Sequence, residues 1–153
     1  MVEVRRIVED EAAQVAALWD RMCRDAVDGG PLTERGRHNI ERMLAASAEH
    51  GDGCCLVAVD EGALVGFVCC EVSAGAGLLP GLVGEISALY VTLDARRRGT
   101  SSRLADAAVT WLRRRGAGTV RTLVCIDAAD TRRFWEQAGF AADMVCLSMY
   151  PAD

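Results

Sequence analysis

Apolar residues recur along this chain with two different spacings, and each spacing predicts a different kind of element. Alternating or short continuous apolar runs predict strands over 2–8, 54–60, 63–74, 83–92, 119–126 and 139–150. Apolar residues three or four positions apart predict helices over 11–27, 34–48, 100–115 and 130–138. The resulting order, β-α-α-β-β-β-α-β-α-β, predicts an α/β fold of the α+β type, a single domain over residues 1–153 with a mixed central sheet flanked by helices.

Short polar signals mark where these elements begin and end. Asp10 and Thr33 precede the first two helices and are expected to cap them, because their side-chain oxygens can accept hydrogen bonds from the first turn. The dipeptide 61–62, Glu-Gly, predicts a tight hairpin turn. Gly116 is expected to end the third helix, and the arginines at 113–115 suit the negative end of its dipole.

The composition is that of a globular protein. Of the 153 residues, 51% are hydrophobic and 25% are charged, which argues against disorder. No apolar run approaches the roughly 20 residues needed to cross a bilayer, so no membrane partner is expected. The N-terminal residues lack a signal-peptide pattern, and a cytoplasmic location is expected.

The seven cysteines lie mostly inside apolar runs, and none forms a CxxC pair or a Cys/His cluster. Adjacent residues of a strand point to opposite faces, so the pairs at 54–55 and 69–70 suit neither a disulfide nor a chelate. We expect reduced cysteines that act as small core residues, and no metal site.

Charge is distributed unevenly along the chain. The net charge is −5, and all 17 basic residues are arginine. Residues 1–95 hold 16 acidic residues and 7 arginines, whereas residues 96–153 hold 10 arginines and 6 acidic residues. The acidic total argues against nonspecific nucleic-acid binding, and the uneven distribution allows a local anion site in the second half.

Three consecutive arginines, 96–98, stand between the strand predicted over 83–92 and the helix predicted over 100–115. A turn of small residues that leads into a helix N-terminus suits an anion, because the first backbone N–H groups lack helical partners and the dipole favours negative charge. Gly99 allows close approach to the backbone, and the guanidinium groups add charge and donors. The alternative is that the arginines are solvated surface charge.

From Val91 onward the chain reads V-x-L-x-x-R-x-x-G-x-S-x-x-L. This resembles the acetyl-CoA motif of the GNAT N-acetyltransferase superfamily, V-x-P-x-x-(R/Q)-x-x-G-x-(G/A)-x-x-L, with Leu93 and Ser101 as departures. Residues 134–140, FWEQAGF, resemble the family segment (L/F)-Y-E-K-x-G-F, and the element order agrees with the family fold over about residues 3–150. The resemblance implies an acetyl-CoA-dependent N-acetyltransferase.

The resemblance also assigns residues to acetyl-CoA, the implied acyl donor. Backbone amides of 97–102 would hold the pyrophosphate. The backbone of 89–91 would pair with the pantetheine arm, and an amide there would donate to the thioester oxygen. The implied cofactor-binding residues are Leu89, Tyr90, Val91, Arg96, Arg97, Arg98, Gly99, Thr100, Ser101 and Ser102.

Glu85 is the candidate general base. It lies six residues before Val91, where several GNAT enzymes carry their base. Glutamate is depleted in central strands and costly to bury without a partner. On an alternating strand, Glu85 shares one face with every second residue that follows, Ser87 to Val91, which puts the carboxylate on the side of the acyl site. The alternative is that Glu85 merely opens the strand at its wet edge.

Deprotonating the acceptor matters more than protonating the leaving group. A primary amine with a pKa near 10.4 costs roughly 4.6 kcal/mol to deprotonate at pH 7, whereas a thiol with a pKa of about 8.5 leaves readily. Trp135 stands where the family often has a tyrosine acid, and Ala128 where it has an asparagine. Water, Tyr90 or Tyr150 could act as the acid, or none is needed. Trp135 suits a substrate contact or a core aromatic equally well.

The sequence says least about the acceptor, the substrate that receives the acetyl group. The resemblance implies that the first two helices and the loop before the Glu85 strand border the acceptor site. Asp25, Asp28 and Glu34 could attract a cationic amine there, although acids on loops are commonly just solvated. The leading hypothesis is acetyl transfer to a small-molecule amine. The alternatives are a protein acetyltransferase for lysine side chains or N-termini, and a non-catalytic acyl-CoA-binding regulatory domain. The final strand and exposed sheet edges would also allow a homodimer.

Overall fold

The computed structural model describes residues 1–26, 29–49, 51–77 and 79–152. Its five strands form one sheet in the order β1-β2-β3-β4-β5, with bounds Glu3–Arg6, Gly53–Asp60, Ala63–Ser73, Leu82–Val91 and Ala117–Thr122. The first four strands are antiparallel neighbours, whereas β5 runs parallel to β4. A parallel neighbour requires a crossover connection, and the third helix provides it. The mixed sheet expected from the sequence is confirmed.

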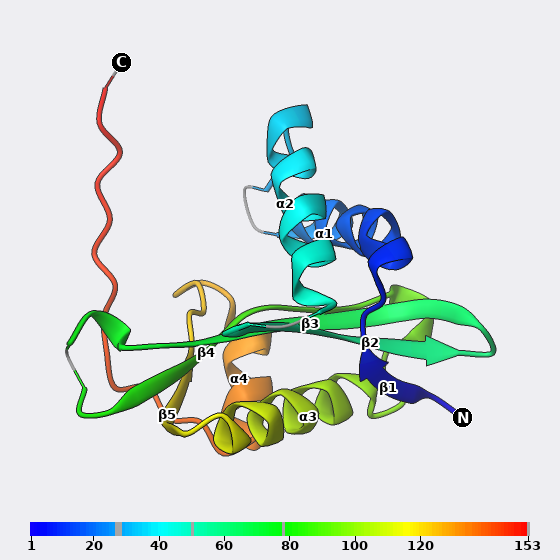
Figure 1. The fold of residues 1–153 in the computed structure, drawn as a ribbon. Helices are drawn as coiled ribbons and strands as arrows, with labels where there is room; N and C mark the ends of the chain where they lie inside the picture. The colour runs from blue at the N-terminus through cyan, green and yellow to red at the C-terminus, as the bar shows by residue number, and fades with distance from the viewer. Residues whose placement is uncertain (27–28, 50, 78, 153) are drawn as a thin grey trace.

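Helices cover both faces of this sheet (Figure 1). Helices α1 (Ala12–Asp25) and α2 (Glu34–Ser47) lie on one face, and α3 (Thr100–Arg114) and α4 (Ala129–Gln137) lie on the other. The alternation within β2 and β3 fills both cores, because Cys55 and Phe67 pack on the α1 side while Leu56 and Val68 pack on the α3 side. Because helices cover both faces of the sheet, a site can form at the ends of its strands.

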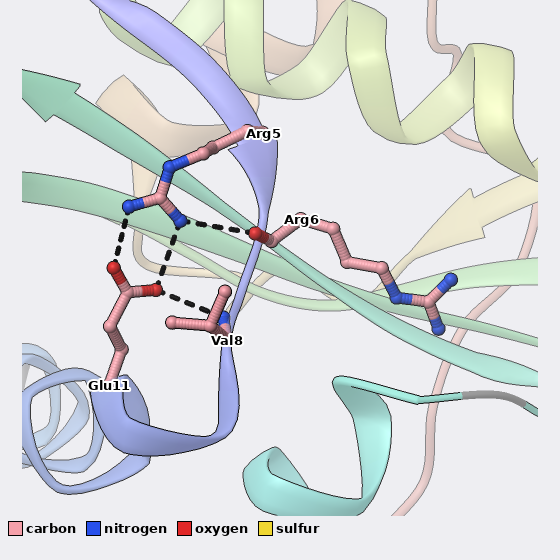
Figure 2. Close-up of polar contacts among 4 residues, drawn as sticks. All are labelled: Arg5, Arg6, Val8 and Glu11. Carbon is pink, nitrogen blue, oxygen red and sulfur yellow. Dashed lines mark hydrogen bonds and ion pairs between the residues drawn. The ribbon is translucent and has the colours of Figure 1, made fainter.

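The start of α1 differs from the expected Asp10 cap. A short 3-10 turn over Glu9–Glu11 precedes the helix, and the side chain that stabilises this turn belongs to Glu11. Its carboxylate accepts the N–H of Val8 at 3.0 Å and two guanidinium nitrogens of Arg5 at 2.6 and 3.1 Å (Figure 2). The hydrogen bond from Arg5 is the main cause that lowers the pKa of Glu11. The prediction for Asp10 is wrong because the 3-10 turn begins at Glu9, so Asp10 lies inside that turn and does not precede the first helical residue.

The other end signals are confirmed. Thr33 accepts the N–H of Gly36 at 3.0 Å and caps α2. Residues 61 and 62 both have positive φ, 49° and 82°, as a tight hairpin turn between two right-twisted strands requires. Gly116, with φ of 94°, follows the last turn of α3.

The C-terminal part of the chain departs most from expectation. The structure assigns no strand within 139–150, and β5 ends at Thr122 instead of continuing to residue 126. Residues 141–152 are all exposed, and in Figure 1 the segment runs outward from the domain so that its end lies far from the rest of the molecule. Residues 139–150 have the alternating apolar pattern of a strand, but they pair with no strand of the described sheet.

The cysteines follow expectation only in the sheet. All seven are free, and the four at 54–55 and 69–70 are buried, with adjacent ones on opposite faces as predicted. Cys125 and Cys146, in contrast, are exposed, because both belong to the segments that form no strand. No helix in the described part of the chain is long and apolar enough to cross a bilayer.

Candidate active site

Strands β4 and β5 are paired along only half of β4. Their register runs from Leu82 opposite Ala117 to Ile86 opposite Thr122, where the Thr122 hydroxyl also donates to the Ile86 carbonyl at 2.8 Å. Beyond this point residues 88–91 pair with β3 alone, so within the described chain the β5 side of 87–91 has no strand partner. Such an open edge can accept an extended, amide-bearing chain as an added strand.

A β-bulge interrupts β4 where this open edge begins. Cys70 lies opposite Ile86 and Cys69 opposite Ala88, which leaves Ser87 as the extra residue. The Ser87 hydroxyl donates to the Cys69 carbonyl at 3.3 Å. One extra residue inverts the alternation of every side chain beyond it.

The bulge changes the neighbours of Glu85. Ile86, Leu89 and Val91 all pack on the α3 side of the sheet. Glu85 precedes Ile86 and therefore faces the α1 side, as Tyr90 does beyond the bulge. The prediction that Glu85 shares a face with Leu89 and Val91 is wrong, because it assumed uninterrupted alternation.

Glu85 lies in a row of charged residues that crosses three strands. Glu71 of β3 is its partner on one side and Arg121 of β5 on the other. Arg121 Nε lies 3.4 Å from Glu85 Oε2, and the two side chains are 29% and 27% exposed. A half-buried carboxylate with a single ion-pair partner keeps lone pairs free for a proton or a water molecule. The sequence reading missed Glu71 and Arg121, although Arg121 stands out as a charge within a short apolar strand.

The loop after β4 presents a group of free backbone donors. Gly99 has φ of 78° and is the N-cap residue of α3, with no side-chain cap. The first helical hydrogen bond is donated by the Arg103 N–H to the Gly99 carbonyl at 3.0 Å. Among the described residues, the backbone N–H groups of 97–102 donate no hydrogen bond to another backbone group. Those donors, together with the positive helix end, suit an anion.

The three arginines before α3 have different partners. Arg96 Nε donates to the Val91 carbonyl at 2.8 Å, and its guanidinium lies over the Tyr90 ring at 5.3 Å. Arg98 lies 3.7 Å from Asp60 and remains 63% exposed. Arg97 is exposed, with φ of 65°. Arg96 therefore ties the loop to the strand, while Arg97 and Arg98 place positive charge in solvent beside the free donors.

Tyr90 and Asp25 form a contact that the sequence did not suggest. The Tyr90 hydroxyl donates to Asp25 Oδ2 at 3.0 Å, and the tyrosine is 5% exposed. Burial, and then this hydrogen bond, raises the pKa of Tyr90. Asp25 is the last residue of α1 and not a loop residue, and it already has a partner. Tyr90 is correspondingly a poor source of protons for a reaction.

The remaining expected substrate residues lie elsewhere. Trp135 is 6% exposed and packs edge-on against Phe134 and Phe140, with ring centroids 5.0 and 4.9 Å away. This geometry fits the core aromatic and not the substrate contact. Asp28 lies outside the described residues.

Neither of two surface cavities is lined by Glu85, by the edge residues 87–91 or by the donors of 97–102. One, of about 510 Å³, is bounded by the start of β4 and the end of α3, and the other, of about 470 Å³, lies on α2. In the described part of the chain, no group of three or more His, Cys, Asp or Glu side chains could hold a metal ion. We define the candidate site, called the wedge below, by the free edge of 87–91, the donors of 97–102 and Glu85.

Comparison with known proteins identifies the family and the fold. A family model described as "Acetyltransferase (GNAT) family" matches residues 16–140, which is most of the chain. No curated protein matches the sequence at a significant level.

Solved structures resemble the fold closely at low sequence identity. One is an aminoglycoside N-acetyltransferase, AAC(6')-Iy, in complex with CoA, with TM-score 0.81, 12% identity and coverage of 99% of this chain and 95% of that chain. A transcriptional regulator from Bacillus halodurans C-125 has TM-score 0.80, 20% identity and coverage of 98% and 99%. A ribosomal-protein-alanine N-acetyltransferase from Brucella melitensis biovar Abortus 2308 has TM-score 0.70, 20% identity and coverage of 98% and 99%. At these identities the similarity shows the fold.

Proposed function

Because the chain belongs to the acetyltransferase (GNAT) family, we propose that it transfers an acetyl group from acetyl-CoA to a primary amine of a small molecule. Family membership makes the chain an acetyl-CoA-dependent N-acetyltransferase. The observation that carries the proposal is the set of free N–H groups at 97–102 beside the open edge of β4.

The wedge fits the two halves of acetyl-CoA. Free backbone donors at a helix N-terminus, with the positive charges of Arg97 and Arg98 nearby, suit the diphosphate. The edge of 87–91 suits the pantetheine arm, whose amides can pair with the strand as a further strand would. Bound in this way, acetyl-CoA supplies an activated acyl group next to Glu85.

Glu85 accepts the proton of the amine in this proposal. A primary amine of pKa near 10.4 is about 3.4 units from neutrality at pH 7, a cost of roughly 4.6 kcal/mol that a nearby base offsets. Glu85 lies just before the point at which β4 and β5 part, and it faces the α1 side. The neutral amine then attacks the thioester carbonyl, and a backbone N–H of 89–91 stabilises the oxyanion. As the intermediate collapses, the C–S bond breaks and the second proton of the amine passes, directly or through water, to the leaving thiolate, which gives the amide and free CoA.

The charge near Glu85 supports a cationic acceptor. Glu71 lies directly opposite Glu85, and Arg121 is the single ion-pair partner that the structure records for the two carboxylates. A second, exposed carboxylate beside the base lowers the energy of an ammonium group there. AAC(6')-Iy and a second solved relative, described in complex with sisomicin, are aminoglycoside acetyltransferases, which supports a small polyamine as acceptor.

A turnover assay tests the proposal. Thiol released from acetyl-CoA is followed over a panel of polyamines, aminoglycosides, monoamines and peptides with free lysines or N-termini. We expect the highest kcat/KM with a small polyamine. Preference for peptides would favour the protein acetyltransferase, and CoA binding without turnover on any amine would favour the non-catalytic domain.

The role of Glu85 is tested separately. Glu85→Gln keeps a hydrogen-bond acceptor for Arg121 but removes the base, so we expect kcat to fall by about 10²- to 10⁴-fold while CoA affinity is retained. The matched control is Glu61→Gln, in the hairpin turn on the surface, which should leave kcat unchanged. An unchanged kcat for Glu85→Gln would remove Glu85 as the base.

A further inference from the structure

Four buried cysteines face one another across β2 and β3. The register places Cys54 opposite Cys70, and Cys55 opposite Cys69. Cys54 and Cys70 pack on the α3 side of the sheet, whereas Cys55 and Cys69 pack on the α1 side. Alternation separates neighbours within one strand, but it puts both thiols of each cross-strand pair on the same face. The sheet therefore holds two dithiol pairs, one in each core.

The Cys54–Cys70 pair has the backbone spacing of a disulfide. The Val72 N–H donates to the Asp52 carbonyl at 2.8 Å, and these two residues lie two positions from the cysteines along the same ladder. Hydrogen-bonded and non-hydrogen-bonded pairs alternate along an antiparallel ladder, so Cys54 and Cys70 are also a hydrogen-bonded pair, with Cα atoms about 5.5 Å apart. Disulfides most often join Cα atoms about 5.5–6 Å apart. A disulfide can therefore close here without a large movement of the strands.

A surface cavity adjoins this pair. It has a volume of about 510 Å³, and Asp52, Val72 and Arg115 are among its lining residues. Asp52 and Val72 lie two positions from Cys54 and Cys70, and Val72 packs against the same core cluster as the two cysteines. Because each cysteine is only 3% exposed, the cavity brings small solutes to the edge of the pair while the pair itself stays buried.

Hydrogen bonding and charge favour a thiolate at Cys54. A hydrogen bond from Cys70 lowers the pKa of Cys54 more than burial raises it, and the charges of Arg6 and Arg115 act in the same direction. The pKa of Cys69 is raised instead, because its hydrogen bond with the facing thiol and its burial both disfavour the thiolate. Since the thiolate is the form that attacks an oxidant, Cys54 is the thiol expected to react first.

We propose that Cys54 and Cys70 are a redox modification site, which a small peroxide converts to a reversible disulfide between β2 and β3. The Cys54 thiolate attacks one peroxide oxygen, the O–O bond breaks, and the hydroxide that leaves takes up a proton to give water. The Cys70 thiol then attacks the sulfur of the resulting sulfenic acid, the S–O bond breaks, and a second water leaves with the Cys70 proton. Two thiols are oxidised, and one peroxide is reduced to two waters.

The first test counts free thiols in the full chain after treatment with hydrogen peroxide. The background carries Cys23→Ser, Cys125→Ser and Cys146→Ser, which leaves the four sheet thiols. We expect these four to fall to two, and dithiothreitol to restore all four. Cys54→Ala should keep its three thiols, whereas Cys55→Ala, the matched control on the opposite face, should lose two. No loss of thiols in the background chain, or equal losses in the two alanine variants, overturns the proposal.

The second test locates the disulfide without a substitution in the core, so it holds even if an alanine variant does not fold. After peroxide treatment, free thiols are blocked with N-ethylmaleimide in acidic denaturant, and the disulfide is then reduced and labelled with iodoacetamide. Mass spectrometry should find iodoacetamide on Cys54 and Cys70, and N-ethylmaleimide on Cys55 and Cys69. The reverse pattern, or iodoacetamide on any other pair, contradicts the proposal. Neither test measures acetyl transfer, so the modification site and the proposed function can fail independently.

Discussion

Two runs of three arginines flank α3, and they behave differently. The second run, Arg113–Arg115, lies at the C-terminal end of the helix, where the dipole favours positive charge. Arg115 also lies over the Trp111 ring at 5.2 Å and donates to the Gly51 carbonyl at 2.7 Å. These contacts explain the second run as helix stabilisation.

The first run, Arg96–Arg98, lies before the N-terminal end of the same helix, where the dipole disfavours a cation. Arg96 has structural contacts, but Arg97 and Arg98 stand beside six backbone N–H groups that donate to no other backbone group in the described chain. Positive charge, free donors and a positive helix end together suit an anion. The comparison supports our proposal that the same three-residue sequence stabilises the fold at one helix end and lies beside an anion site at the other.

Charge reversal should separate the two runs most strongly. Arg97→Glu with Arg98→Glu removes two cations beside the diphosphate and adds repulsion, so we expect the Kd for CoA to rise about 100-fold, taking tenfold for each 1.4 kcal/mol. Arg113→Glu with Arg114→Glu should leave that Kd unchanged and lower the Tm, because each reversal opposes the helix dipole. Calorimetry and thermal melts read the two effects. If both double variants raised the Kd for CoA equally, the two arginine runs would not differ in their role in CoA binding.

The glycines next to the runs provide a second matched pair. Gly99 and Gly116 have φ of 78° and 94°, and an added Cβ would meet no backbone atom at either. Alanine at each position should cost about 1–2 kcal/mol of folding stability, since both require left-handed backbone. Only Gly99→Ala should also weaken CoA binding, by about tenfold, because relief of the strain moves the donors of 97–102. If Gly116→Ala also weakened CoA binding, the weaker binding of Gly99→Ala would follow from its lower folding stability and not from displaced donors.

We expect the smallest effect from a change in the Arg5–Glu11 ion pair, which lies outside both arginine runs. Arg5 is satisfied by Glu11, and the pKa of Glu11 is lowered by that hydrogen bond. A lowered folded-state pKa stabilises the protein above the unfolded pKa, about 4.5, and this contribution is lost as pH falls through the folded value.

Glu11→Gln should therefore lower the free energy of unfolding by about 1 kcal/mol at pH 7 and leave CoA affinity unchanged. Its free energy of unfolding should converge with that of the wild type as pH falls below 4.5 and through the lowered pKa of Glu11. Denaturant melts between pH 3 and 7 measure this convergence. A difference that stays constant with pH would mean that the pair contributes through packing and not through charge.

The sequence predicts most of the fold because its signals are local. The alternation of 54–60 and 63–74, the Thr33 cap and the glycine after α3 each involve residues within a few positions of one another, and the structure confirms them. The donors at 97–102 follow from the same kind of signal, a strand, a glycine and a helix in sequence.

The errors arise where the outcome depends on a distant partner. The face of Glu85 depends on the bulge at Ser87, which is a property of the register between β3 and β4 and cannot be read from β4 alone. The strand predicted over 139–150 has a sound pattern, but its own sheet supplies no neighbour. Arg121 was overlooked because its importance comes from Glu85, 36 residues away.

The central claim concerns individual backbone N–H groups, and a titration of the ¹⁵N-labelled protein with CoA observes them directly. The amide signals of 97–102 should move most, downfield as they gain acceptors, while those of 113–116 at the other end of α3 stay in place. Pantetheine, which lacks the diphosphate, should move the signals of 87–91 but not those of 97–102. If CoA leaves the 97–102 amides unchanged, or moves 113–116 as much, the anion site is not where this account puts it.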